Sequence, residues 1–329
     1  MSPLSVLFIG GTGTISSACA RVAAERGIDL TVLNRGKTSV RPVPPGVRVL
    51  TADIRDGESA RAALAGREFD AVADFVAYTP DHVDADIRLL SGRVGQYVFI
   101  SSASVYQKPP ARLPIRESTP LRNPYWAYSR GKIACEERLT AEYRERGFPV
   151  TIVRPSHTYD RTSVPLLGGW TAVDRMRRGK PVVVPGDGTS LWVLTHHADF
   201  ARAFVPLLGL PQAVGETVHI TGDEAQPWNQ IYTTLGRAAG AEPHLVHVTS
   251  EQIAKTVPEW GPGLLGDKSH SVIFDNTLVR SLVPGWNAAI SWAEGAREIV
   301  GWFDADPARR ITDPRADAAI DALAALALR

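Results

Sequence analysis

Short apolar runs recur along the first half of the chain, and each is followed by a segment with apolar residues at helical spacing. The runs are rich in Val, Ile and Phe and show little polar alternation, which is typical of strands buried on both faces. They lie at residues 5–9, 30–33, 47–50, 71–76, 96–100 and 150–153. This repeated order of strand and helix predicts an α/β fold with a doubly wound parallel sheet, whose ligands lie at the carboxyl ends of the strands.

The regular alternation fades after Arg154. The pieces that follow predict helices over 165–178 and 198–208 and strands over 182–184 and 218–221. We therefore expect a first domain over residues 1–160 and a smaller C-terminal lobe over 161–310 that is interleaved with the end of the sheet. Residues 311–329 are rich in Ala and Leu, which favours a helical tail with a weakly anchored end.

The composition is that of a globular protein, with 329 residues, 44% hydrophobic and 22% charged. Lys and Arg number 36 against 35 Asp and Glu, so a net charge of +1 provides no global field for a nucleic acid or an acidic membrane. The two cysteines, Cys19 and Cys135, fit neither a disulfide framework nor a metal site, and they favour a reducing cytoplasm. We find no apolar window of ~18 to 20 residues for a membrane helix, and the opening run is too short for a signal peptide. These features predict a soluble, cytoplasmic protein without a membrane partner and make nucleic acid an unlikely one.

The first predicted strand runs directly into the glycine-rich turn GGTGTIS at 10–16, and a helical segment follows at 18–26. Gly10, Gly13 and Ser16 have the spacing of a dinucleotide-binding turn, in which glycines permit a tight turn and a close approach of the backbone to pyrophosphate. The amides that open the helix would then meet the phosphates. A plain tight turn is the alternative, but the position in a βαβ unit favours a Rossmann-type dinucleotide-binding domain over residues 1–160.

The end of the second strand bears on the choice between NAD and NADP. A NAD-binding unit places an acidic residue about 20 residues beyond the turn, to bind the ribose 2′-hydroxyl. Here the strand ends in Asn34 and Arg35, with Lys37 close behind, and cationic side chains suit a 2′-phosphate. NADP(H) is therefore slightly favoured over NAD(H), although both cations could be solvated loop charges. Asp53, which Ile54 follows, could bind the adenine amino group or cap a helix.

A tyrosine and a lysine lie four residues apart on the next long helix, which is predicted over 125–146 because Asn123-Pro124 has the pattern of a helix start. Tyr128 and Lys132 then share one face. A phenol has a pKa of about 10 and acts as a base near neutral pH only when that pKa is strongly lowered. An adjacent ammonium and an oxidised nicotinamide both favour the phenolate.

Two serines, Ser101 and Ser102, lie where the fifth predicted strand ends. The carboxyl ends of parallel strands share one edge of a sheet, so these hydroxyls face the same crevice as the glycine-rich turn. Taken separately, a Tyr–Lys pair is often a solvated surface pair, and a serine after a strand is often a cap.

The combined pattern resembles the short-chain dehydrogenase/reductase superfamily, in the extended branch of NAD(P)-dependent epimerases and dehydratases. The resemblance covers most of the chain. Its landmarks are GGTGTIS (10–16), ADIRD (52–56), FISSASVY (99–106), YSRGK (128–132), VRPSHTY (153–159) and EGAREIVGWF (294–303). The resemblance implies that Tyr128 is the catalytic acid/base, that Lys132 binds the nicotinamide ribose and lowers the pKa of the tyrosine, and that Ser102 binds the reacting oxygen.

The same resemblance implies that Pro155 lies against the nicotinamide and that residues 75–78 line its other side. The predicted cofactor contacts are Gly10, Gly13, Thr14, Ile15, Asn34, Arg35, Lys37, Asp53, Ile54, Phe75, Ala77, Tyr128, Lys132 and Pro155. The predicted substrate contacts are Tyr78, Ser104, His157 and Trp192.

The sequence departs from the family pattern in places that bear on the substrate. Members that use nucleotide sugars usually have Asn where His157 stands, and an Arg for the diphosphate about where Trp192 stands. Trp192 is either a core residue or a surface on which a sugar or aglycone ring stacks. His157 either orients a substrate hydroxyl, carries a second proton near neutral pH, or is structural. The motif NRG (34–36) and the missing third glycine are similar to atypical members grouped near plant stem-loop RNA-binding proteins. These departures argue against a nucleotide-sugar substrate.

Other polar clusters predict no further site. His196 and His197 are adjacent and point in different directions, so no metal is predicted. A basic cluster has the pattern of a solvated helix end and lacks the aromatic platforms of an RNA-binding site. Its members are Arg175, Arg177, Arg178 and Lys180.

The sequence therefore predicts an NAD(P)-dependent oxidoreductase or epimerase that exchanges hydride with a secondary alcohol or ketone of a sugar-like or polyol molecule. Dehydration is disfavoured because Ala103-Ser104 stands where the dehydratases of the resembling group usually have Asp-Glu. The alternative is a non-catalytic, cofactor-sensing or RNA-binding protein on the same fold. The resemblance also makes a homodimer plausible, although nothing in the sequence shows one.

Overall fold

The computed structural model describes residues 2–36 and 40–327. Its central sheet has seven parallel strands in the order β10-β6-β5-β4-β1-β2-β3. The strands are β1 (Ser5–Ile9), β2 (Asp29–Asn34), β3 (Arg48–Thr51), β4 (Ala71–Asp74), β5 (Tyr97–Ile100), β6 (Val150–Pro155) and β10 (Thr217–Ile220). The strand order reverses between β1 and β4, and such a reversal opens a crevice at the carboxyl ends. The predicted doubly wound parallel sheet is confirmed.

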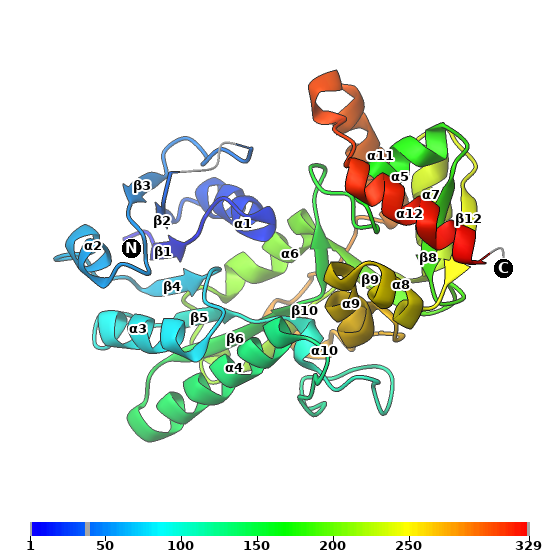
Figure 1. The fold of residues 1–329 in the computed structure, drawn as a ribbon. Coiled ribbons are helices and arrows are strands. Elements are labelled where there is room, and N and C mark those ends of the chain that lie inside the picture. The colour runs from blue at the N-terminus through cyan, green and yellow to red at the C-terminus, as the bar shows by residue number, and fades with distance from the viewer. Residues whose placement is uncertain (1, 37–39, 328–329) are drawn as a thin grey trace.

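Helices cover both faces of this sheet (Figure 1). Alternate residues of β1 enter opposite cores: Val6 and Phe8 pack with the helices of one face, and Leu7 and Ile9 with those of the other. This two-sided burial is why the strands appear in the sequence as unbroken apolar runs. The helices of the first face are α1 (Thr14–Glu25), α6 (His197–Phe204) and α10 (Thr277–Leu282), and those of the second are α2 (Gly57–Ala63), α3 (Pro80–Leu90) and α4 (Ala127–Arg146).

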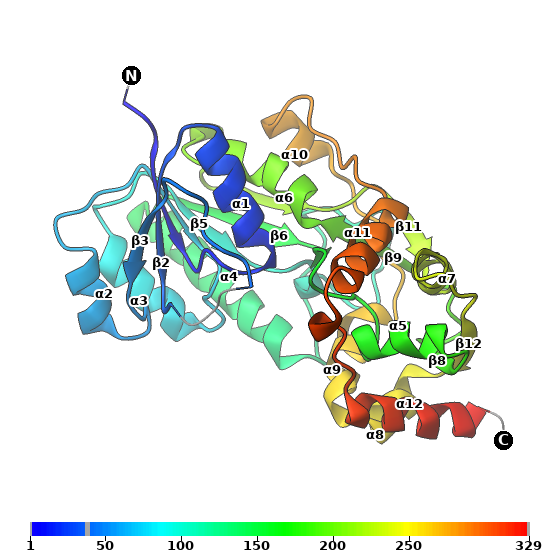
Figure 2. The ribbon, with the colours of Figure 1, turned by 90° about the horizontal axis from the view of Figure 1, so that it is seen from above.

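A second region lies at one end of the sheet, as the view from above shows (Figure 2). It holds a three-stranded sheet of order β11-β9-β7 and a two-stranded sheet, β12-β8. Its strands are β7 (His157–Tyr159), β8 (Pro181–Pro185), β9 (Leu191–His196), β11 (Ala225–Pro227) and β12 (His244–Val248). Its helices are α5 (Trp170–Arg177), α7 (Trp228–Ala238), α8 (Ser250–Thr256), α9 (Gly261–Gly263), α11 (Trp292–Asp304) and α12 (Pro314–Ala327).

Short helical turns complete the structure. The 3-10 turns are η1 (Ala103–Val105), η2 (Val205–Leu207), η3 (Pro211–Ala213), η4 (Pro258–Trp260) and η6 (Pro307–Arg309), and η5 (Leu264–Lys268) is a π-helical turn. The chain returns from the second region to the first sheet through α6, β10 and α10. The division at residues 160 and 310 stays a prediction. Among the described residues, no helix has the length and apolar character needed to cross a bilayer.

The C-terminal helix is anchored by a buried arginine. Arg175 is fully buried, and its Nη1 and Nη2 donate to Asp317 Oδ1 at 2.5 Å and Asp321 Oδ1 at 2.6 Å. Ile320 and Leu323 are buried in the same contact. The prediction of a solvated basic cluster is therefore wrong for Arg175, and the helix of the C-terminal tail is anchored through its first three turns.

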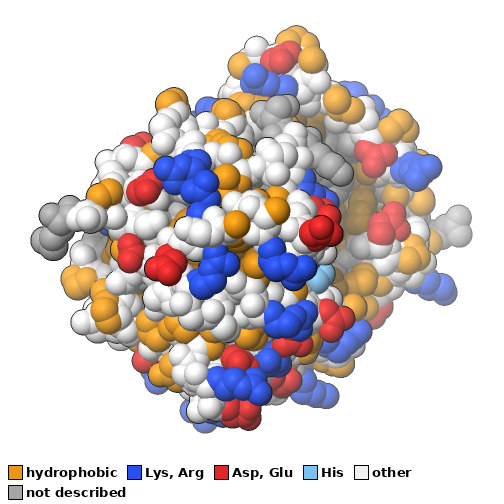
Figure 3. Space-filling model, turned by 90° about the vertical axis from the view of Figure 1, so that its left-hand side faces the viewer, with side chains coloured by type: hydrophobic (Ala, Val, Ile, Leu, Met, Phe, Trp, Pro, Cys, Tyr) orange, Lys and Arg blue, Asp and Glu red, His pale blue; other side chains and the backbone are white. Residues whose placement is uncertain are grey.

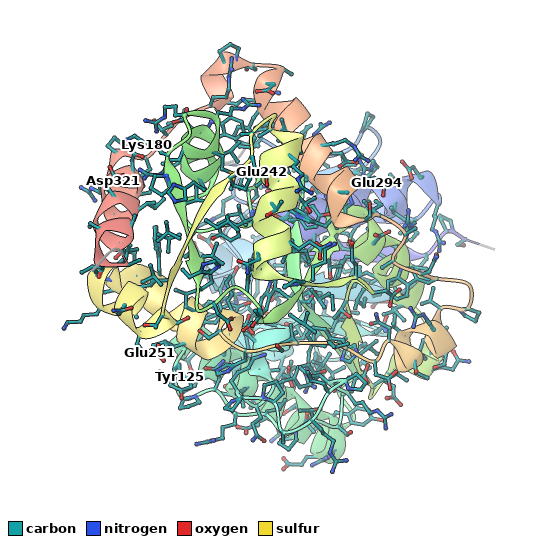
Figure 4. All side chains as sticks on the ribbon, turned by 90° about the vertical axis from the view of Figure 1, so that its right-hand side faces the viewer. Tyr125, Lys180, Glu242, Glu251, Glu294 and Asp321 are labelled. Carbon is teal, nitrogen blue, oxygen red and sulfur yellow. The ribbon has the colours of Figure 1, made fainter. Side chains whose placement is uncertain are left out.

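The other three cations of that cluster are also paired, at the surface. Arg177 pairs with Asp304, Arg178 with Asp174, and Lys180 with Asp317 and Asp321. Figure 4 shows Lys180 and Asp321 on neighbouring elements at the edge of the molecule. Asp174 lies on α5 itself, four residues before Arg178, whereas the other partners lie on α11 and α12 and could not be inferred from spacing along α5.

We expect Arg175→Met to weaken the docking of α12. The change removes two charge-assisted hydrogen bonds, each worth about 1.5 to 3 kcal/mol, and leaves the two carboxylates only their longer surface pairs with Arg178 and Lys180. Amides of residues 314–327 should exchange with deuterated water at least tenfold faster, while the strands of the central sheet keep their protection. Arg144→Met, at an exposed position of α4, is the matched control. Unchanged exchange in α12 would contradict this anchoring role.

Candidate active site

A first cavity of about 500 Å³ opens at the carboxyl ends of β1, β2 and β3. Six of the predicted cofactor contacts line it: Gly10, Gly13, Asn34, Arg35, Asp53 and Ile54. Arg41 and Arg55, which the sequence analysis did not single out, line it as well. The predicted cofactor residues of the first three strands are thus brought to one cavity.

The glycine-rich turn needs its first glycine for two reasons. Gly10 has a φ of +86°, and a Cβ there would lie 2.5 Å from Val76 Cγ1. Gly13 caps α1, and its N–H donates to Ser16 Oγ at 2.9 Å. The first amides of α1, from Thr14 onward, therefore open toward the first cavity, where a helix N-terminus favours an anion.

Arg35 and Asp53 lie close together in the wall of this cavity. Arg35 Nη1 lies 4.0 Å from Asp53 Oδ2, and both side chains are well exposed. Asp53 does not cap α2; that carboxylate is Asp56, which accepts from the Glu58 and Ser59 amides. Asp53 Oδ1 instead accepts from the Arg55 amide at 3.0 Å. Lys37 lies outside the described residues.

A second cavity, of about 230 Å³, lies at the carboxyl ends of β5 and β6. It brings together six predicted residues from four stretches of the chain: Ser102, Ser104, Tyr128, Pro155, His157 and Trp192. The Tyr128 phenol contacts the Ser102 hydroxyl, and Ser102 Oγ lies 2.9 Å from Ser104 Oγ. Trp126 packs beside the phenol, with ring centroids 4.9 Å apart. This arrangement aims a phenol and a serine hydroxyl into one small space.

The two neighbouring serines have different surroundings. Ser101 is buried, and its hydroxyl bonds to Glu136, which also accepts from Arg154 Nη2 at 2.5 Å. Ser102 lines the second cavity. Ser101 therefore belongs to a buried polar network that fixes α4 on the sheet, and Ser102 is the hydroxyl open to a ligand.

Lys132 is held behind the tyrosine. Its Nζ donates to Ala77 O and Ile100 O, each at 2.6 Å, and lies 5.8 Å from the centroid of the Tyr128 ring. Burial lowers the pKa of Lys132 to about 8 and raises that of Tyr128 to about 12. The protein alone therefore does not lower the pKa of Tyr128 as expected, because burial raises this pKa more than the contact with Ser102 lowers it.

Residues 75–78 take different roles. Tyr78 lines the first cavity, and its ring lies beneath the Lys132 ammonium, 4.7 Å from centroid to Nζ. The Phe75 ring instead packs in the core against Phe8 and Phe204, with centroids 5.2 and 5.6 Å away. Ile15 likewise packs against that core. The side chains of Phe75 and Ile15 therefore face away from the first cavity, and only the backbone of these two residues is left to contact a cofactor.

His157 and Trp192 form one unit in the wall of the second cavity. Trp192 Nε1 donates to His157 Nδ1 at 3.1 Å, and the indole stacks on Trp228, with centroids 5.4 Å apart. Burial and the nearby Lys268 ammonium lower the pKa of His157 to about 3. The imidazole is thus neutral at physiological pH, which favours a hydrogen-bonding role for His157 over that of a second proton carrier.

Three residues of this site gave no signal in the sequence. Trp126, Asp267 and Lys268 line the second cavity, and the last two come from η5, far beyond α4 in the sequence. Asn123 joins these segments, because its Nδ2 donates to Ser104 O at 2.8 Å and to Gly266 O at 2.7 Å. The helix-start motif at Asn123 was visible in the sequence, but its reach to η5 was not.

The adjacent histidines are used structurally. His196 Nε2 lies 3.0 Å from Glu298 Oε2, and His197 Nδ1 lies 3.2 Å from Thr14 O, which ties α6 to the start of α1. Within residues 2–36 and 40–327, no cluster of three His, Cys, Asp or Glu side chains is arranged to hold a metal ion.

Known proteins resemble the chain over most of its length. A chloroplast stem-loop binding protein of 41 kDa from Arabidopsis thaliana is 26% identical, over 76% of this chain and 68% of its own. The 2′-dehydrokanamycin reductase of Streptomyces kanamyceticus is also 26% identical, over 86% of this chain and 80% of its own. The fold matches that of UDP-glucose 4-epimerase from Bifidobacterium longum, solved with NAD+ and UDP, with a TM-score of 0.74 at 18% identity over 92% and 98% of the two chains. The model of the NAD dependent epimerase/dehydratase family matches residues 6–221, and the chain therefore belongs to this family of enzymes.

Proposed function

We propose that the protein is an NAD(P)-dependent oxidoreductase or epimerase that exchanges hydride with a secondary alcohol or ketone of a sugar-like or polyol molecule. One observation carries the proposal: Tyr128 and Ser102 face the same small cavity at the carboxyl ends of β5 and β6, next to the cavity of the glycine-rich turn. A phenol at the carboxyl ends of a dinucleotide-binding sheet is suited to proton transfer during hydride exchange.

The residues of the first cavity fit a dinucleotide. The required glycine at Gly10, the open N-terminus of α1 and a volume of about 500 Å³ together suit a pyrophosphate with an adenosine on one side. Two of the three donors of the Lys132 ammonium are taken by Ala77 and Ile100, which leaves one for a ribose hydroxyl. A bound NAD(P) supplies or accepts the hydride.

The chain's own residues would handle the proton. In ketone reduction, Tyr128 donates its phenolic proton to the carbonyl oxygen, while the Ser102 hydroxyl donates a hydrogen bond to the same oxygen. Because the pKa of Tyr128 is raised to about 12, the phenol holds this proton at physiological pH. In alcohol oxidation the phenol must lose it first, and the positive charge of an oxidised nicotinamide favours that loss.

Hydride exchange is tested with a panel of cyclic polyols and the matching ketones. Net oxidation or reduction changes the absorbance of the nicotinamide at 340 nm, whereas epimerisation inverts a stereocentre that NMR detects without net change in absorbance. Dehydration stays disfavoured on sequence, because Ala103 and Ser104 supply no acid/base pair beside the tyrosine. Failure of NAD(H) and NADP(H) to bind at concentrations near 1 mM would overturn the proposal.

Arg35 is proposed to favour NADP(H). Its guanidinium ends β2 within the first cavity, where it could meet a 2′-phosphate, although Asp53 would compete for it from 4.0 Å away. Arg35→Gln should raise the Kd of NADPH about tenfold and leave that of NADH within twofold, as measured by fluorescence transfer from tryptophan to the reduced nicotinamide. The control is Arg88→Gln, an exposed position on α3. Equal effects on both cofactors would contradict a 2′-phosphate contact.

The stem-loop binding relative favours a second candidate, an RNA-binding protein on the same fold. Figure 3 shows one face of the molecule on which Lys and Arg side chains are interspersed with Asp and Glu, rather than gathered in one basic patch. Binding of a structured RNA at several salt concentrations tests this candidate, and a steep salt dependence without cofactor binding would favour it. The homodimer and the cytoplasmic location remain predictions from the sequence.

A further inference from the structure

An ammonium without a counter-ion lies in the wall of the second cavity. Lys268, the last residue of η5, has its Nζ 5.9 Å from the ring centroids of both Trp126 and Trp192. Within the described part of the chain, no carboxylate lies within 4.0 Å of this Nζ, and no side chain or carbonyl accepts a hydrogen bond from it. A π-helical turn is itself common at functional sites, because it bends the chain away from regular helix geometry.

The neighbouring carboxylate is already paired. Asp267 lines the same cavity, but its Oδ1 lies 3.0 Å from Nζ of Lys108, which is fully buried. His157 is neutral, and the cavity wall between it and Ser102 carries only hydroxyl and apolar groups. Asp267, Lys108 and Lys268 together therefore carry a net charge of +1. A partly buried ammonium costs free energy until an anion or a set of acceptors satisfies it.

The size of the space limits what that anion can belong to. A third cavity, of about 180 Å³, adjoins the second, of about 230 Å³, and His157 and Lys268 line both. Even taken together, the two lie near the lower end of the range of about 300 to 1,000 Å³ found for ligand pockets. No arginine of the described chain lines either cavity, and arginine is the residue best suited to bind a diphosphate by two parallel hydrogen bonds. The space therefore suits one ring and one compact charge.

We propose that the substrate is a small ring compound that carries one carboxylate, which Lys268 binds between the indoles of Trp126 and Trp192. The inference rests on the proposed function, because that function identifies the second cavity as the substrate site, and it adds the chemical class of the substrate. A point charge on a flexible stem is sufficient for a single carboxylate. The aromatic walls of Trp126 and Trp192 would at the same time contact the ring.

Binding of benzoate and of its neutral isostere benzamide to the whole chain, without added cofactor, tests this inference by calorimetry. Benzoate should bind at least tenfold more tightly than benzamide. Lys268→Met should reduce this ratio to about one, and Lys268→Arg should retain most of it. Lys255→Met, on an exposed part of the nearby α8, is the matched control and should leave the ratio unchanged. Shifts of the indole N–H signals of Trp126 and Trp192 in NMR spectra should accompany benzoate binding.

Two results would overturn the inference: no preference of the native protein for benzoate over benzamide, or a preference that persists in Lys268→Met. The first comparison needs no variant and so holds even if the methionine variant does not fold. NADPH binding is measured on the same preparations and should be the same within twofold in native protein and Lys268→Met. A native protein that binds NADPH but shows no preference for benzoate contradicts this inference alone, whereas absent NADPH binding contradicts the proposed function.

Discussion

Tyr128→Phe is expected to lower kcat for ketone reduction about a thousandfold, since a positioned acid contributes about 10² to 10⁴ to the rate. The phenylalanine ring keeps the contacts with Trp126 and Tyr78, whose ring centroids lie 4.9 and 6.2 Å from that of Tyr128. What it removes is the hydroxyl that touches Ser102 and faces the second cavity. Water is a poor substitute in so small a space, so the loss should fall on kcat and leave the Kd of NADPH within twofold.

Single-turnover measurements at 340 nm, with a ketone that the native protein reduces, separate this effect from substrate binding. Tyr125→Phe is the matched control, because Tyr125 lies three residues away, is 49% exposed and lies outside both cavity walls (Figure 4). It should retain native rates. If Tyr128→Phe also turned over at a native rate, the phenol would not be the acid, and the enzyme would need another proton donor.

The central sheet could be predicted from sequence because its strands are buried on both faces. The run at 5–9 coincides with β1, and those at 150–153 and 30–33 fall within β6 and β2. Burial on two sides leaves few polar positions in the inner strands, so most of them stand out as short, mainly apolar blocks, whereas the edge strand β3 is largely exposed. The order of such blocks along the chain then determines the βαβ topology.

The second region was harder to predict because its pieces are short and depend on distant partners. Helix 165–178 was predicted too long: α5 begins at Trp170, since Gly168 and Gly169 have φ values of +80° and +57° and interrupt the helix. β9 and β12 were missed. β12 pairs with β8, about 60 residues earlier, and is only partly buried, so no apolar run marks it.

The residues of the candidate active site likewise differ in how far they could be predicted from sequence. Tyr128, Ser102 and the glycine-rich turn lie within or directly beside the helix and strands that position them. Local sequence motifs were therefore sufficient to identify them. Lys268 reaches the second cavity only because η5 docks on Asn123, and a lone lysine between ordinary residues has no local signature. The neutral state of His157 likewise depends on burial, which sequence spacing does not reveal.

The glycine-rich turn allows folding and cofactor binding to be separated. Gly10→Ala should damage both, because its φ is positive and its Cβ would clash with Val76. Gly13 differs: its φ is −78°, which any residue adopts, and a Cβ would meet only Ser16 Oγ, at 3.3 Å. A methyl group at Gly13 is therefore tolerated by the fold but stands at the N-terminus of α1, in the wall of the first cavity.

Gly13→Ala should accordingly raise the Kd of NADPH about a hundredfold, or about 2.7 kcal/mol, because the pyrophosphate needs the bare backbone at this turn. The thermal midpoint should fall by no more than about 4 °C, the change expected for about 1 kcal/mol in a chain of this size. Gly301→Ala, in α11 with nothing near its Cβ, is the control and should leave the Kd unchanged. A Kd for Gly13→Ala within threefold of native would mean that the pyrophosphate does not approach this turn, and the first cavity would then hold some other ligand.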